Sequence, residues 1–208
     1  MDRNPSREVR GNACLALATL RKDDAKYGTN KQATVEAEKL FQRVIAEFGP
    51  VKRDGTPLAE LAKPELYELQ CLSIGKPAPP TEGEDLGGRS LRLRDYRGKV
   101  VLLVFWGACG GCRPDVTALR GLLERFKGKP FVILGVYCDE DVAKASEIVE
   151  KTGMIWPSLR DRRSGPISKE WNNNAWPVFQ IVDTKGVIRY RNVWELQLAQ
   201  AVESLMAE

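Results

Sequence analysis

The chain has 208 residues, of which 43% are hydrophobic and 29% charged, which is typical of a soluble globular protein with one ordinary domain and an additional segment. The formal net charge of +4 is spread along the chain without a nucleic-acid-binding motif, and histidine is absent, which excludes His-based metal sites and Ser–His–Asp triads. No run reaches the ~18 apolar residues that span a membrane, and the first residues lack the apolar core of a signal peptide.

The N-terminal third is predicted to be helical. Apolar residues recur at helical spacing over 31–48, and the preceding stretch 6–27 reads as a first helix. The segment "AEKLFQRVIAEFG" is similar to the second helix of a tetratricopeptide-type hairpin, and one such pair cannot bury its own apolar face. We therefore expect it to pack on the next domain, on a partner or on further repeats. A third helix is expected over 58–72, interrupted at Pro64.

The Pro- and Gly-rich segment 73–90 predicts a boundary between two parts of the chain. Within it, "DLGG" between "TEGE" and "SLRL" indicates a hairpin turn. The predicted domains are a helical extension over 1–73 and an α/β domain over 74–208.

From residue 100 onward, strands and helices alternate. We predict strand 100–105, helix 110–127, strand 130–137, helix 141–152, the segment "WPSL", a short helix near 166–172, strands 178–183 and 187–191, and a helix over 195–207. Strands joined by a helix pair in parallel, and strands joined by a tight turn pair antiparallel. The sequence therefore predicts a mixed sheet with helices on both faces.

Two cysteines three positions apart, Cys109 and Cys112, follow the most apolar run of the chain. At the start of the predicted helix, backbone N–H groups would favour a Cys109 thiolate. The spacing lets Cys112 resolve a mixed disulfide formed by Cys109. Gly110 and Gly111 free the backbone for the turn and leave the sulfur uncovered. Half of a zinc site and a purely structural pair are the alternatives, although no second Cys-x-x-Cys exists.

Four stretches occur in the order expected of a known family: "GKPAPP", "LRDYRGKVVLLVFWGACGGCRPDV", "GVYCDED" and "AWPVFQIVDTKGVIRY". Over residues 74 to 207 the chain resembles thioredoxin-like thiol–disulfide oxidoreductases of the TlpA/ResA type, within the redoxin or AhpC/TSA superfamily. The resemblance implies a thioredoxin-like fold, preceded here by the small α-helical segment. It also implies that Cys109 attacks, that Cys112 resolves, and that Pro177 is a cis-proline beside them, with Trp156–Pro157 as the competing cis bond.

Other residues near the motif receive expected roles. Trp106 corresponds to the tryptophan that ends the family's strand, and we expect it to contact the substrate together with Gly110, Gly111 and Trp176. Arg113 and Cys138 are possible auxiliary groups, with a solvated arginine and a partly buried small residue as the plainer interpretations.

The sequence also departs from the family pattern. Ala108 replaces the usual tryptophan before Cys109, and the loop is one residue shorter. Val104 stands where thioredoxin has a buried acid, so protons must come from solvent or another residue. Pro114 comes early and could disturb the first turn of the following helix.

The expected function is exchange of disulfides with protein substrates and a redox partner protein, using the Cys-Gly-Gly-Cys couple and no metal or other cofactor. The helical extension is a possible second protein contact. The alternatives are a peroxiredoxin-like peroxide reductase, which usually needs Thr or Ser before the reactive cysteine, and a redox-idle protein-binding module. The resemblance implies an extracytoplasmic protein whose leader is absent from this chain, with a cytoplasmic one as the alternative.

Overall fold

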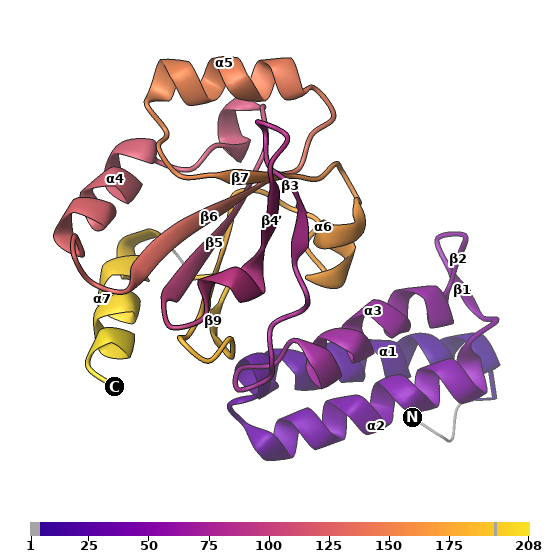
Figure 1. Ribbon diagram of the computed structural model, residues 1–208. Helices are drawn as coiled ribbons and strands as arrows, with labels where there is room; N and C mark the ends of the chain where they lie inside the picture. Colours follow the sequence, from indigo (N-terminus) through magenta and orange to yellow (C-terminus); the bar gives the residue numbers. More distant parts are fainter. Residues whose placement is uncertain (1–4, 194) are drawn as a thin grey trace. The chain divides into compact units, whose positions relative to one another are not determined.

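The computed structural model describes residues 5–193 and 195–208 and divides the chain into two compact units, Met1–Lys76 and Pro77–Glu208 (Figure 1). Across the described ranges, no helix combines the length and apolar character needed to cross a bilayer. The predicted boundary after residue 73 lies close to this division, and the assignment of 1–73 and 74–208 as two domains stays a prediction.

The first unit is a three-helix assembly. Its elements are α1 (Arg7–Ala25), α2 (Lys31–Phe48), a small hairpin of β1 (Lys52–Arg53) and β2 (Thr56–Pro57), and α3 (Leu58–Cys71). Ser6 and Asn30 cap the first two helices by accepting backbone N–H groups with their side chains. The third helix supplies the apolar surface that a helix pair lacks, because residues from all three helices form one buried cluster.

The expected interruption at Pro64 is wrong, because α3 runs through it. A proline costs a helix one backbone hydrogen bond. Here the helix continues because Leu58, Ala62 and Leu69 are buried on its inner face and anchor both sides of the proline.

The second unit is built on a five-stranded mixed sheet with the order β7-β6-β5-β8-β9. Its elements are β3 (Glu82–Glu84), β4 (Ser90–Arg92), β5 (Val100–Trp106), α4 (Val116–Arg125), β6 (Phe131–Tyr137), α5 (Val142–Thr152), β7 (Ser158–Arg160), α6 (Pro166–Glu170), β8 (Val178–Val182), β9 (Ile188–Arg191) and α7 (Glu195–Met206). Strands β5, β6 and β7 are parallel, and β8 and β9 join antiparallel. The predicted mixed sheet and the β3–β4 hairpin are confirmed.

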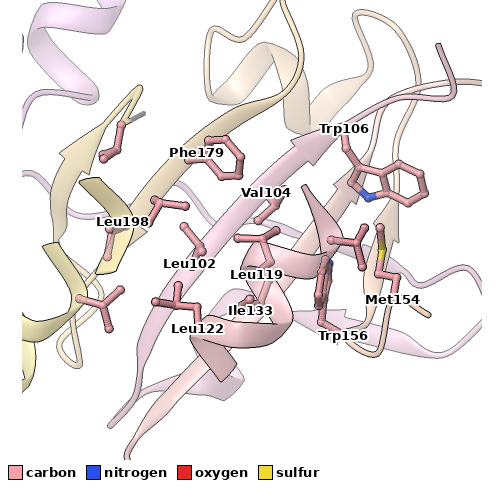
Figure 2. Packing of buried hydrophobic residues seen from close by; sticks show 14 of the residues in the cluster. Leu102, Val104, Trp106, Leu119, Leu122, Ile133, Met154, Trp156, Phe179 and Leu198 are labelled. Carbon is pink, nitrogen blue, oxygen red and sulfur yellow. The ribbon is translucent and has the colours of Figure 1, made fainter. Parts of the chain in front are cut away.

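Helices cover both faces of this sheet. Leu102 and Val104 of the central strand β5 belong to a cluster that includes residues of α4, α5 and α7 (Figure 2). On the opposite face, Phe105 packs edge-on against Trp171, which directly follows α6, with ring centroids 6.0 Å apart. Every residue of β5 is buried. This strand is therefore fixed from two sides, and the loop that leaves its end starts from a rigid point.

Candidate redox site

The loop after β5 carries the two cysteines. Cys109 and Cys112 form a disulfide with their Cα atoms 5.1 Å apart. Cys109 is exposed, whereas Cys112 is half-buried. Within the loop, Gly107 N–H donates to Cys112 O at 3.0 Å, and Cys112 N–H donates to Cys109 O at 3.1 Å. The arrangement presents one sulfur to solvent and keeps the second behind it.

The prediction that an α-helix begins at residue 110 is wrong. Only a 3-10 turn covers Gly110–Cys112, and α4 begins at Val116, after Asp115 caps it by accepting Ala118 N–H at 3.0 Å. The physical reason is Pro114, because a proline disfavours helical backbone at the preceding residue. Arg113 accordingly has extended angles of φ −93° and ψ 138°. Cys109 thus lacks the α-helix N-terminus that was expected to stabilise its thiolate.

Gly110 and Gly111 line the exposed side of the disulfide. A Cβ atom at either position would meet nothing within 4 Å. The left-handed backbone region contains eight of the described glycines but neither of these two. Their backbone conformation therefore does not require glycine, and what they provide is open space around the sulfurs.

The peptide bond between Trp176 and Pro177 is cis, as the resemblance implied. Pro177 and Gly111 border a groove of about 570 Å³, whose other lining residues are Arg113, Val178, Phe179, Asn192, Val193 and Leu196. Trp176 is half-buried, with the Arg163 guanidinium 5.3 Å from its ring centroid. A largely apolar groove thus opens beside the disulfide.

The prediction that Trp106 contacts the substrate is wrong. Its side chain is fully buried in the sheet core (Figure 2), where the ring lies 4.7 Å from that of Tyr137. The indole N–H donates to Ser158 Oγ at 3.2 Å. Gly135 makes this packing possible, because a Cβ there would lie 3.1 Å from the indole nitrogen and 2.1 Å from Ser158 Oγ. The Trp106 side chain therefore packs in the core at the end of β5, where the loop begins, and is not exposed at the surface of the loop.

Cys138 lies at the end of β6, on the edge of the sheet from which the loop emerges. Its thiol is fully buried, and Ser168 Oγ approaches the sulfur at 3.6 Å. Burial, together with the Asp161 carboxylate, raises the pKa of this thiol to about 12, whereas the hydrogen bond from Ser168 opposes the rise. Such a thiol is neutral and covered at physiological pH, which argues against an auxiliary role in exchange.

The free cysteines offer a direct check of this assignment. In the reduced native protein, we expect iodoacetamide at pH 7.5 to alkylate Cys109 and the exposed Cys71, and to leave Cys138 unmodified until the chain is unfolded. Peptide mass spectrometry after timed quenching distinguishes the sites, with Cys71 as the internal positive control. Alkylation of Cys138 at a rate comparable with that of Cys71 would contradict a buried, protonated thiol.

Asp139 is a site residue that sequence reasoning missed. Its Oδ2 accepts the backbone N–H of Ala108 at 2.7 Å, and Arg113 donates to Ala108 O from Nε at 3.2 Å and from Nη2 at 2.8 Å. The relevant pattern was "CDED" after the second parallel strand. Because Trp106 pairs with Tyr137 in the register of β5 and β6, the residues two positions further along each chain become neighbours.

Comparisons with known proteins agree with this geometry. The model of the AhpC/TSA family matches residues 74–191. Thiol-disulfide oxidoreductase ResA of Geobacillus kaustophilus is 29% identical over 123 residues, covering 59% of this chain and 70% of the relative. ResA of Bacillus cereus strain ZK is 30% identical over 122 residues, covering 58% of this chain and 70% of the relative.

Among solved structures, the thioredoxin domain of a thiol-disulfide oxidoreductase from Bacteroides vulgatus superimposes with a TM-score of 0.60 at 28% identity. The match covers 64% of this chain and 98% of that domain. The match therefore covers nearly the whole of that thioredoxin domain.

Proposed function

The chain belongs to the AhpC/TSA family and is a thiol–disulfide oxidoreductase of the TlpA/ResA type, and from this we propose that Cys109 and Cys112 are its redox couple. The observation that carries the proposal is the disulfide between an exposed Cys109 and a half-buried Cys112 at the end of a buried strand. Exchange needs an accessible sulfur for the first attack and a second sulfur within reach for the resolution.

In the proposed reaction, the reduced protein is the starting point. The Cys109 thiolate attacks one sulfur of a substrate disulfide, and the other substrate sulfur leaves as a thiol after taking up a proton. Cys112 then attacks the Cys109 sulfur of the mixed disulfide. The second substrate sulfur leaves, and the pair is oxidised by two electrons while the substrate disulfide is reduced. A redox partner protein returns the pair to the dithiol, so the reaction needs no group beyond this disulfide.

We propose protein disulfides as substrates because of the groove beside the couple. Apolar side chains of Pro177, Val178 and Leu196 line it, and Leu196 is 98% exposed. An extended segment that carries a cysteine would bury these side chains when its sulfur reaches Cys109. Gly110, Gly111 and the half-buried Trp176 keep their proposed place as substrate contacts. A protein contact through the helical unit stays a prediction.

The peroxide-reductase alternative is less well supported. Gly107 and Ala108 precede Cys109, so the hydroxyl that usually activates peroxide in a peroxiredoxin is missing from those positions. The guanidinium of Arg113 donates to Ala108 O through two nitrogens. No feature of this loop favours peroxide over a disulfide.

Parallel assays of the full chain with dithiothreitol as reductant test the proposal. We expect accelerated precipitation of insulin, whose disulfides are reduced, and hydrogen peroxide consumption no faster than without protein. Faster turnover of peroxide than of insulin would favour the peroxide reductase. A Cys109–Cys112 disulfide that resists dithiothreitol, with no activity in either assay, would favour the redox-idle binding module.

We further propose an extracytoplasmic location. The proposal rests on the TlpA/ResA type of the chain. Cell fractionation of the native host, with a cytoplasmic enzyme as marker, tests it. Co-fractionation with that marker would contradict it.

A further inference from the structure

The peptide groups of Ala108 are held by two side chains of opposite charge. Asp139 accepts the Ala108 N–H at 2.7 Å, and Arg113 donates twice to the Ala108 carbonyl oxygen. Hydrogen bonds to ionised groups are shorter and stronger than neutral ones. Ala108 directly precedes Cys109, so these contacts fix the backbone that presents the nucleophile.

The same carboxylate borders the second cysteine. A Cβ atom on Gly107 would lie 2.8 Å from Asp139 Oδ2 and 3.3 Å from Cys112 Cβ. Asp139 and the Cys112 side chain therefore adjoin the same small space, which only a glycine leaves open. Residue 104 is a buried valine, so it supplies no carboxylate near the couple. Asp139, which follows β6, is a carboxylate that does lie beside it.

Several charges meet at this edge of the sheet. Burial, together with the carboxylates of Asp139 and Asp141, raises the pKa of Tyr137 to about 12, and Arg113 opposes the rise. Asp141 also caps α5 by accepting Lys144 N–H at 3.0 Å. Cys138, the remaining neighbour, is neutral because its own pKa is raised to about 12. The charged groups that act on Tyr137, the partner of Trp106 at the start of the loop, are thus Asp139 and Asp141, which are negative, and Arg113, which is positive.

We propose that Asp139 is a positioning residue that makes the Cys109–Cys112 couple a better reductant, by holding the loop through Ala108 while its negative charge disfavours thiolates in the reduced pair. The inference rests on the proposed function. A couple whose reduced form is stabilised is a strong oxidant, and a neighbouring carboxylate does the opposite. The absence of an α-helix start at Cys109 removes a group that would counteract it. Two electrons and two protons then pass from the dithiol to the substrate disulfide.

The decisive measurement is the redox potential of the full chain between pH 5 and pH 9, by equilibration with glutathione. In Asp139→Asn the amide oxygen still accepts the Ala108 N–H, but the charge is gone. We expect the difference between this variant and the wild type to be smallest at pH 5, where a smaller fraction of the thiols is ionised than at pH 9. At pH 9 it should be more oxidising by up to about tenfold in the equilibrium constant, which is ~30 mV for a two-electron couple. A purely structural role would give a difference that does not grow with pH.

Two further variants make the test specific. Asp141→Asn removes a like charge at the same edge and keeps a helix-capping side chain, and its pH-dependent shift should be smaller than that of Asp139→Asn, because it is Asp139 that holds the Ala108 N–H. Arg113→Gln removes the positive charge and should shift the potential in the opposite direction at pH 9, which remains measurable if Asp139→Asn fails to fold.

The outcomes separate this inference from the proposed function. A wild-type protein that does not equilibrate with glutathione would contradict the redox couple itself. A wild type that equilibrates normally, with Asp139→Asn showing no pH-dependent gap or Arg113→Gln shifting in the same direction, would overturn only the role of Asp139.

Discussion

Replacing Cys109 with serine is expected to abolish insulin reduction and to prevent any mixed disulfide. The exposed sulfur is the one that a substrate disulfide can approach, and a hydroxyl is not ionised at neutral pH, so no nucleophile remains. Replacing Cys112 with serine should also abolish turnover, but for a different reason. Cys109 would still attack, and the mixed disulfide would accumulate because no second sulfur resolves it.

The two variants are best compared on non-reducing gels and by intact-protein mass spectrometry after incubation with a disulfide-bonded protein. Cys71→Ser is the matched control, since Cys71 is an exposed thiol of the helical unit and its loss should leave turnover unchanged. Full turnover by Cys109→Ser would contradict the proposed redox couple, and trapping by Cys109→Ser but not by Cys112→Ser would reverse the assignment of the two roles.

Replacing Trp106 with alanine should destabilise the protein by about 3–5 kcal/mol, the usual cost of removing a buried aromatic ring. The ring is fully buried against Tyr137, and its loss would also leave Ser158 Oγ without the indole donor. Urea unfolding followed by circular dichroism measures the change in the free energy of unfolding.

Trp106→Phe keeps most of the ring and separates a structural role from contact with a substrate. We expect it to cost less stability than alanine, and to leave the KM for a peptide disulfide unchanged because residue 106 does not reach the groove. A several-fold rise in KM with little loss of stability would show that the side chain at this position does meet the substrate.

The strands of the sheet could be predicted from sequence because their apolar runs are continuous. The predicted strands 100–105 and 130–137 differ by one residue from Val100–Trp106 and Phe131–Tyr137. The same continuity hid the role of Trp106. In a strand that is buried on both faces, the pattern does not distinguish a residue that points into the core from one at the surface.

The start of α4 and the position of the Asp139 carboxylate beside the loop could not be predicted from hydrophobic periodicity. The predicted helix began at residue 110, whereas the effect of Pro114 on Arg113 delayed the start of α4 to Val116. Asp139 acts on Ala108, and the two are 31 positions apart in the chain. Finding that contact requires the register between β5 and β6, which single-sequence patterns do not contain.

The open space at Gly110 and Gly111 bears on how such a protein can evolve. Because neither the backbone angles nor any neighbouring atom restricts these two positions, substitutions there are nearly free of cost to folding. Gly107, in contrast, is held by Asp139 and Cys112 on one side of the loop. Substitutions at positions 110 and 111 can therefore change the charge and size of the side chains between the two cysteines while the supporting loop keeps its conformation.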